Sequence, residues 1–257
     1  MFTAKKTQKS PLVYPNDRPG ATSVIISTIP PTVADIVTPF LGGGSAELGL
    51  TARDYSVTAY TEYRLLYDFW KCALQDPEKL YKMASSFHPI GDPRMFTVLQ
   101  KKVYQPDDEY LRSALFYVLN HCTEDGTTTA GKMQPGHPRF NEMRLNQLAS
   151  FEADPFNIEL ENYKAAIETQ DYLVGYMPDY MPTNLVGAVI IPESPQINHK
   201  KFAKLIKARQ SEGWTLLYKY HEDLLELYAD CDITLFGEGY RPTTNPSRAK
   251  EVMIVGP

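Results

Sequence analysis

Apolar and polar positions change their spacing many times along this chain, and the changes predict alternating strands and helices. Apolar residues three or four positions apart predict helices over residues 64–74, 77–85, 108–119, 141–151, 163–170, 199–212 and 222–229. Short β-branched or apolar runs predict strands over residues 24–27, 33–37, 57–60, 158–160, 187–191, 214–218, 232–236 and 252–255. This alternation indicates an α/β sheet with helices on its faces.

One predicted helix also carries a charge pattern. In residues 199–212, Phe202, Leu205 and Ile206 are expected to point inward, and Gly213 is expected to end the helix. Its basic residues are expected to form the solvent-exposed face: Lys200, Lys201, Lys204, Lys207 and Arg209.

The middle of the chain interrupts the alternation. Residues 88–106 show weak periodicity, and residues 121–140 form a loop rich in Thr, Gly and Pro. We therefore predict an α/β domain built from residues 1–75 and 157–257, with a helical insert over residues 76–156.

Composition restricts the classes of protein. The chain has 257 residues, 43% of them apolar, and a net charge of −5. The sequence shows neither a run of about 20 apolar residues nor a secretory signal, so a cytoplasmic protein without a membrane partner is expected. Cys72, Cys122 and Cys231 lie too far apart for a disulfide framework or a Cys-x-x-Cys metal site. His121 and Cys122 precede two acidic residues, but no second pair stands at ligand spacing, and no metal site is expected.

The most specific motif covers residues 38–48, TPFLGGGSAEL. It follows a predicted strand and leads into a predicted helix or tight turn at Ser45. A glycine-rich turn between a strand and a helix is typical of a nucleotide-type site at the carboxyl end of a parallel strand.

Several segments in order along the chain resemble Dam-type adenine DNA methyltransferases, which methylate the amino group of adenine. They are residues 9–14 (KSPLVY), 38–48, 67–70 (YDFW), 75–78 (QDPE), 114–120 (ALFYVLN), 139–141 (RFN) and 251–255 (EVMIV). The resemblance implies a Rossmann-like methyltransferase sheet with a helical target-recognition insert, and S-adenosylmethionine as cofactor. The cofactor-binding residues that it implies are Tyr14, Pro39, Phe40, Gly42, Gly43, Gly44 and Ser45.

Two further cofactor positions depart from the family. The family places an acidic residue for the ribose hydroxyls after its second strand; Thr61 stands there, and a shift of one residue would let Glu62 serve. The family also has Gly-Gly-Lys after its first motif, where this chain has residues 16–20, NDRPG.

The larger departure is the catalytic tetrad. The family requires Asp, Asn or Ser, then Pro-Pro and an aromatic residue, whereas the single Pro-Pro here is Pro30-Pro31. One register places residues 177–180, MPDY, on the tetrad after the apolar run 172–176. The rival register uses residues 192–195, PESP, after the run 188–191. In the first register Pro178 is retained, Tyr180 would stack on a flipped base and Asp179 would accept a hydrogen bond from another direction, because Met177 cannot.

The resemblance places target recognition in the insert, with double-stranded DNA as partner. The residues expected to contact DNA are Lys132, His137, Arg139, Asn141 and Arg144. The alternative interpretation of the basic residues among them is a solvated surface loop.

Three functions remain open. The first is a DNA-modification transferase that acts on a flipped base but differs from a standard adenine methylase in target base or transferred group. An amino acid added to a modified pyrimidine in viral DNA is one example, since bacteriophages use such chemistry to evade restriction. The second is a divergent, active adenine methyltransferase, with Asp179 or Glu193 as the acceptor. The third is a catalytically inactive relative that binds DNA or protein.

Overall fold

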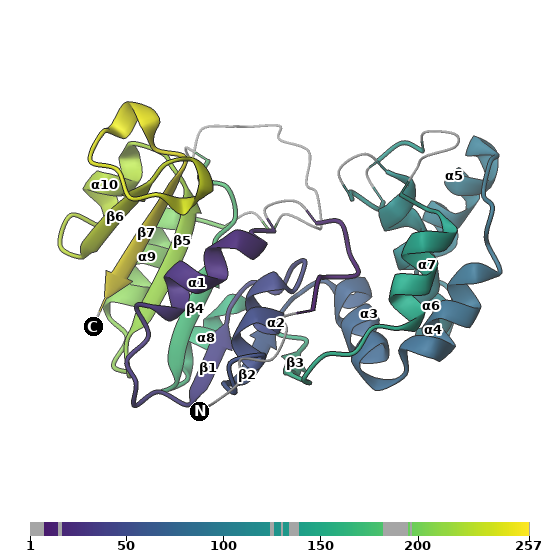
Figure 1. Ribbon diagram of the computed structural model, residues 1–257, viewed down its shortest axis with the longest axis horizontal. Coiled ribbons are helices and arrows are strands. Elements are labelled where there is room, and N and C mark those ends of the chain that lie inside the picture. Colours follow the sequence, from purple (N-terminus) through teal and green to yellow (C-terminus); the bar gives the residue numbers. More distant parts are fainter. Residues whose placement is uncertain are drawn as a thin grey trace.

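The computed structural model describes residues 8–256 apart from 15–16, 124–125, 130, 134–138, 182–194 and 196. Within these residues one sheet of seven strands has the order β3-β2-β1-β4-β5-β7-β6 (Figure 1). The first five strands of that order run parallel, and β7 is antiparallel to both of its neighbours. The strands are β1 (Asp35–Thr38), β2 (Ser56–Tyr60), β3 (Asn157–Glu159), β4 (Tyr172–Tyr176), β5 (Trp214–Lys219), β6 (Asp232–Phe236) and β7 (Glu251–Gly256). The expected α/β architecture is confirmed, and the mostly parallel sheet is compatible with a Rossmann-like fold.

Helices pack on both faces of the sheet. Successive strand residues point to opposite faces, and Ile36 and Val37 of β1 accordingly belong to two different hydrophobic clusters. The first cluster includes buried residues of α1 (Thr22–Ile26), α2 (Ser45–Thr51) and α3 (Arg64–Gln75). The second includes those of α8 (Tyr163–Glu168), α9 (His199–Lys207) and α10 (Asp223–Leu227).

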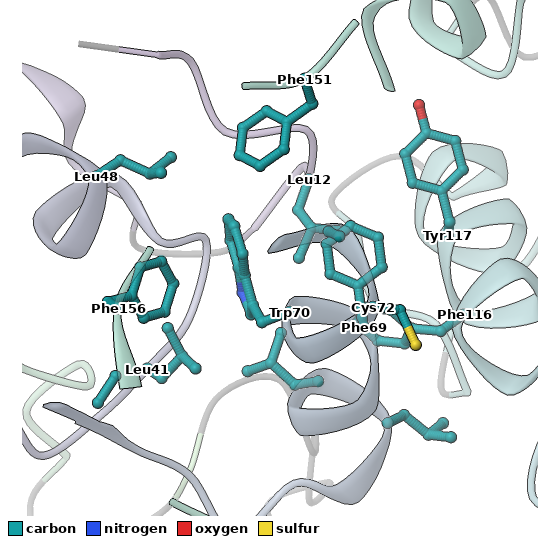
Figure 2. Packing of buried hydrophobic residues seen from close by; sticks show 14 of the residues in the cluster. Leu12, Leu41, Leu48, Phe69, Trp70, Cys72, Phe116, Tyr117, Phe151 and Phe156 are labelled. Carbon is teal, nitrogen blue, oxygen red and sulfur yellow. The ribbon is translucent and has the colours of Figure 1, made fainter. Parts of the chain in front are cut away.

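A helical lobe stands beside the sheet. It contains α4 (Pro77–Ser85), α5 (Pro93–Lys102), α6 (Glu109–Cys122) and α7 (Glu142–Ala149), and it packs against α3 (Figure 1). Aromatic side chains join the two parts: Phe69 of α3 stacks on Tyr117 of α6, and Trp70 contacts Phe156 just before β3 (Figure 2). The lobe therefore shares the first hydrophobic cluster with the sheet.

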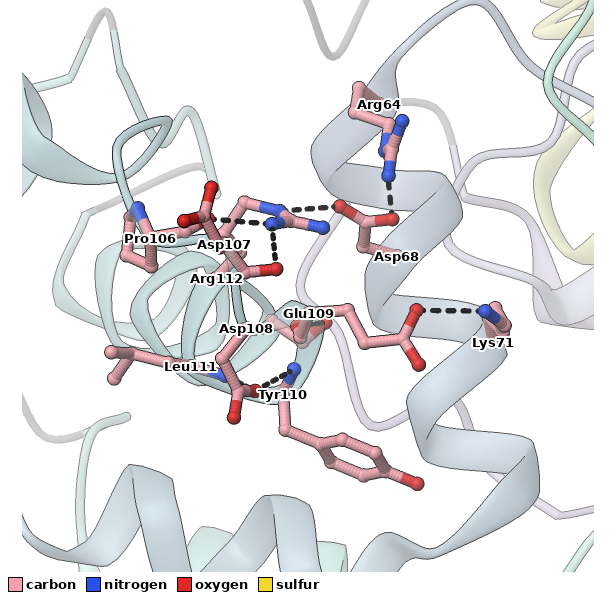
Figure 3. A network of polar contacts seen from close by, with 11 residues as sticks. Arg64, Asp68, Lys71, Pro106, Asp107, Asp108, Glu109, Tyr110, Leu111 and Arg112 are labelled. Carbon is pink, nitrogen blue, oxygen red and sulfur yellow. Dashed lines mark hydrogen bonds and ion pairs between the residues drawn. The ribbon is translucent and has the colours of Figure 1, made fainter.

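Ion pairs fix the start of α6 on α3. Asp68, which is fully buried, accepts hydrogen bonds from the Nε atoms of Arg64 and Arg112, each at 2.8 Å (Figure 3). Arg112 also donates to the carbonyls of Pro106 and Asp107, so its position depends on the loop before α6. Lys71 and Glu109 add a more exposed pair at 2.7 Å.

One sequence prediction in the first half of the chain is wrong. Residues 24–27 were expected as a strand, but residues 24–26 belong to α1 and Ser27 is its C-cap, because the buried residues Ala21, Ile25 and Ile29 are four positions apart, which is a helical spacing. Helix α5, which was not predicted, lies in the stretch of weak periodicity. Its signal is local: Asp92 caps the backbone amide of Arg94, and Pro93 occupies the first turn.

The predicted helix over residues 199–212 is also corrected. Helix α9 ends at Lys207, and Arg209 is buried instead of lying on the solvent-exposed face of the helix. Its guanidinium donates to the carbonyls of Ile167, Thr169 and Gly213. These hydrogen bonds link the segment before β4 to the segment before β5. The expected strand 187–191 lies outside the described residues. No helix in the described ranges is long and apolar enough to cross a membrane.

Candidate functional site

Two adjoining cavities open at the carboxyl ends of β1, β2 and β4. The first is lined by the glycine loop, Asp17, Glu47 and the residues that follow β4. The second is lined by residues that follow β1 and β2, including Glu62, and by Tyr163 of α8. Both linings include Tyr14, Phe40, Leu41 and Pro195, so the two cavities adjoin, and together they are called the groove below.

The glycine loop connects β1 to α2 and leaves no room for side chains. Gly44 has φ +77°, and a Cβ atom there would strike the ring of Trp70. The Trp70 Nε1 donates to the Gly42 carbonyl at 3.0 Å, which fixes the turn against α3. A Cβ at Gly43 would lie 2.6 Å from the Asp17 carboxyl carbon, and one at Gly42 would lie 2.8 Å from the Tyr14 ring. The backbone of the loop therefore forms a wall of the first cavity.

One buried carboxyl group, Glu47, and one half-buried carboxyl group, Asp17, flank the start of α2. The Ser45 hydroxyl donates to Asp17 at 2.6 Å, and the Thr38 hydroxyl donates to Glu47, also at 2.6 Å. Burial raises the pKa of Glu47 to about 7, and the hydrogen bond from Thr38 opposes this shift only in part. Burial likewise raises the pKa of Asp17. Sequence reasoning selected Ser45 but neither carboxyl group.

The N-terminal segment that carries Tyr14 is held by the helical lobe. Asn120 of α6 accepts from the Val13 amide at 2.9 Å and donates to the Val13 carbonyl at 2.6 Å. The same side-chain amide donates to the Gly126 carbonyl at 3.0 Å. This clamp holds Tyr14 where it lines both cavities, and its role as a cofactor-binding residue stays a prediction.

The two residues after β2 differ in exposure: Thr61 is buried, and Glu62 is exposed. Thr61 is buried, its hydroxyl accepts from the Tyr63 amide and its own amide donates to the Glu159 carbonyl. Glu62 is exposed and lines the second cavity. Glu62, and not Thr61, is therefore accessible to a ligand.

Residues 177–180 follow directly after β4, and only the first two of them line a cavity. Met177 and Pro178 are buried and line the first cavity. Tyr180 does not line either cavity: its ring lies 5.0 Å from that of His199 and 4.7 Å from that of His221. The Tyr180 hydroxyl donates to Asp223 at 3.2 Å. Of the rival register, residues 192–194 lie outside the described residues, and Pro195 lines both cavities.

A buried histidine holds this segment, and sequence reasoning missed it. The His199 Nε2 lies 3.2 Å from the Asp179 carbonyl, which can only accept, so Nε2 carries the proton. Its Nδ1 lies 3.4 Å from the Tyr218 hydroxyl, which in turn lies 3.2 Å from that of Tyr228. Burial lowers the pKa of His199 to about 4, so the ring is neutral at physiological pH. A histidine at the first position of an amphipathic helix gives no sequence signal for this contact.

The predicted DNA contacts lie in the helical lobe, and none of the described ones lines a cavity. Asn141 caps α7 by accepting from the Arg144 amide at 3.0 Å. Arg144 is half-buried, and its guanidinium donates to Gln147. Lys132 is exposed, Arg139 is half-buried, and His137 lies outside the described residues. Among the described residues no three His, Cys, Asp or Glu side chains are grouped to hold a metal ion.

Comparisons with models of known protein families and with curated proteins give no match for this chain.

Proposed function

We propose that this chain is a DNA-modification transferase that acts on a base flipped out of the duplex, with a reaction altered from standard adenine methylation. The observation that supports it most is the groove. It combines the glycine loop after β1, the acidic residue after β2 and the segment after β4 at one edge of the sheet. In open α/β sheets this edge is where ligands bind.

The topology supports the Rossmann-like sheet that the resemblance implies. The strand order 3-2-1-4-5 is that of a Rossmann sheet, and here the antiparallel β7 lies between β5 and β6. This argument concerns the fold, and the site carries the function.

The residues present fit S-adenosylmethionine. Tyr14 and the backbone of Gly42, Gly43 and Gly44 would hold it in the first cavity, and Glu62 would accept from the ribose hydroxyls in the second. When bound, this cofactor supplies an activated methyl group beside a sulfonium. A Cβ atom at Gly42 or Gly43 would meet the side chain of Tyr14 or Asp17, so both positions require glycine for the loop to lie against these cavity residues.

The segment after β4 supports an altered target. In the register of residues 177–180, Met177 takes the place of the family's hydrogen-bond acceptor, and it lines the first cavity beside Pro178. These side chains exclude water but cannot orient an amino group by accepting strong hydrogen bonds from it. Such a surface suits the methyl group of thymine or a modified pyrimidine. Tyr180, the expected stacking residue, is already engaged by His199, His221 and Asp223.

One observation favours the alternative, an active adenine methyltransferase. The Asp179 Oδ1 atom is buried and has no hydrogen-bond partner among the described residues. A buried acceptor without a partner calls for an explanation. An amino group delivered to Asp179 would satisfy it, provided that the segment after Pro178 rotates toward the cavity.

The helical lobe supports DNA as the partner. It carries Lys132, Arg139 and Arg144, and the exposed face of α5 adds Arg94, Lys101 and Lys102. Basic side chains of this kind contact phosphates without reading sequence.

The test is mass spectrometry of nucleosides from DNA of cells that express the protein, compared with DNA from its native source. A modified pyrimidine in native DNA that disappears when the gene is disrupted supports the proposal. Adenine methylated on its amino group, dependent on the protein, supports the alternative. Ordinary nucleosides in both samples overturn both and leave a binding protein without catalysis.

A Gly43→Val variant tests whether the glycine loop belongs to the site. Its side chain would displace Asp17 and fill the wall of the first cavity, so modification should be lost. Its thermal unfolding should show a folded protein, because Asp17, unlike Trp70 beside Gly44, lies at the cavity. Full activity in this variant would show that the glycine loop is not part of the site.

A further inference from the structure

Helix α5 has an outer face that exposes apolar side chains. Its inner side chains Phe96 and Leu99 are buried in the first hydrophobic cluster, where the helix packs against α6. Five large apolar side chains are exposed in the part of the chain that the structure describes. Three of them lie in α5 or two residues after it: Met95, Val98 and Tyr104. Exposed apolar side chains that gather on one element mark an interaction site, so α5 is a candidate docking surface.

The charges on the same face indicate the chemistry of the partner. Arg94, Lys101 and Lys102 are exposed, and no residue of α5 is acidic. Arg94 forms one ion pair, an exposed one with Asp92 at 3.5 Å. Because residues three or four positions apart share one side of a helix, Val98 lies between Arg94 and Lys101. In a protein with a net charge of −5, this face fits a partner that is negatively charged and also offers apolar groups.

Duplex DNA offers both properties in its major groove. Phosphates lie along both rims of that groove, and the methyl group of thymine projects from the base edges inside it. The major groove is about 12 Å wide and admits an α-helix. Helix α5 has 10 residues, which corresponds to a length of about 15 Å. Its size, charge and apolar side chains therefore match this groove.

Hydrogen bonds connect α5 to the candidate site. The Gln100 side-chain amide donates to the carbonyls of Thr128 and Gly131, each at 2.8 Å, in the segment between α6 and α7. The Thr128 hydroxyl lies 3.0 Å from the hydroxyl of Tyr63, which lines the second cavity. Lys132, one of the predicted DNA contacts, directly follows Gly131. These bonds hold α5 in one arrangement with the groove and with a predicted DNA contact.

We propose that α5 is the element of this protein that reads DNA sequence. Its outer face lies in the major groove, where Met95 and Val98 contact thymine methyl groups and Lys101 and Lys102 bind phosphates on the rims. The inference rests on the proposed function for its partner, duplex DNA. It adds what the basic residues of the lobe do not supply, since contacts to phosphates position a protein on DNA without reading the sequence.

The salt dependence of DNA binding tests the docking of α5. Fluorescence anisotropy measures the affinity of the full chain for a duplex of mixed sequence at several salt concentrations. Each phosphate contact adds about 0.9 to the slope of log affinity against log salt concentration. Lys101→Gln and Lys102→Gln should each lower the slope by about that amount. Arg53→Gln is the matched control and should leave the slope unchanged, because Arg53 is exposed near the amino end of β2.

Exchange of thymine for uracil tests the reading of sequence. Duplexes that the wild type binds most tightly are selected from a pool with a random central segment. The selected duplex is then made again with deoxyuridine in place of thymidine, which removes only the methyl groups. The affinity of the wild type and of Arg53→Gln should fall about fourfold for each contacted methyl group. A variant with both Met95→Ala and Val98→Ala should bind the two duplexes equally.

The outcomes separate this inference from the proposed function. Equal affinity of the wild type for both duplexes, or unchanged slopes in both lysine variants, overturns the inference and leaves the proposed reaction to the nucleoside analysis. Thymine-dependent binding through α5 without any modified nucleoside supports the inference and overturns the proposed reaction. A wild type that binds no duplex DNA overturns both.

A second copy of the chain is the competing occupant of this face. Sedimentation of the wild type and of the variant with Met95→Ala and Val98→Ala tests it. Equal molecular masses of the two proteins are expected. A dimer that dissociates in the variant while DNA binding stays unchanged would overturn the inference.

Discussion

Replacing Glu47 with glutamine should stabilise the protein, and the gain should grow with pH. Burial raises the pKa of Glu47 from 4.5 to about 7. A carboxyl group with a raised pKa favours the folded state while it is protonated, and that contribution is lost as the pH rises through the folded pKa. Fully developed, the shift corresponds to about 3 kcal/mol. Between pH 5 and pH 8 about 2.5 kcal/mol of it should be lost from the wild type.

Glutamine keeps the shape and the contact but not the charge. Its carbonyl oxygen can still accept from the Thr38 hydroxyl, which donates to Glu47 at 2.6 Å. Neutralising Glu47 also relieves its repulsion of Asp17, which acts in the same direction. The stability of Glu47→Gln relative to the wild type should therefore increase by about 2.5 kcal/mol between pH 5 and pH 8. In a chain of this size that is a change of about 5–10 °C in relative unfolding temperature.

Urea unfolding of both proteins at pH 5 and pH 8 measures this difference. Because the two proteins share every other titratable group, the comparison isolates Glu47. The exposed Glu168, changed to glutamine, is the control and should show no such dependence on pH. If Glu47→Gln is no more stable than the wild type at pH 8, or if the gain is equal at both pH values, burial does not raise the pKa of Glu47 as described.

Three further outcomes follow from packing and charge. Asp68→Ala leaves the largely buried guanidinium of Arg112 without its carboxylate partner and should destabilise the fold by about 3 kcal/mol in urea unfolding. Glu78→Ala, which removes an exposed pair with Lys82, should change the stability by about 0.5 kcal/mol or less. Gly44→Ala should lower the unfolding temperature sharply because a Cβ atom would strike Trp70. Gly239→Ala, at a similar φ with open space around it, should lower the free energy of unfolding by no more than about 1–2 kcal/mol. Equal losses of stability in the two variants would contradict the packing argument. His199 is buried and neutral, and its lowered pKa contributes stability that is present above pH 6.5 and lost as the pH falls toward 4. The stability of the wild type relative to His199→Gln should therefore fall by about 3 kcal/mol between pH 7.5 and pH 4. Parallel pH profiles of the two proteins would place a charged ring there.

Local signals in the sequence predicted the parts of the fold that depend on local structure. Strand β1, the glycine turn and α2 were found because the strand, turn and helix patterns follow one another without a gap. Helix α1 was misread as a strand because β-branched residues dominate residues 24–27, although burial follows the four-residue spacing of Ala21, Ile25 and Ile29. In that segment packing overrides propensity.

The chemistry of the site was predicted less well, for a physical reason. The glycines, Tyr14 and Glu62 carry motif signals, and the structure brings all of them to one groove. Asp17 and Glu47 carry no signal as residue types, since their properties come from burial, which a sequence does not display. Arg209 is the converse case: a basic residue after an amphipathic helix resembles a surface charge until the carbonyls around it are known.

The position of β7 affects how the sheet can be assembled during synthesis. This strand is the last of the seven to leave the ribosome, yet it lies between β5 and β6. Until Glu251–Gly256 has been made, β5 and β6 each keep an unpaired edge with exposed amide and carbonyl groups. Such edges are sites where a nascent chain pairs wrongly with itself or with a neighbour. The nascent protein must therefore keep β5 and β6 apart until β7 has been made, and slow translation between β6 and β7 lengthens the period in which these edges can aggregate.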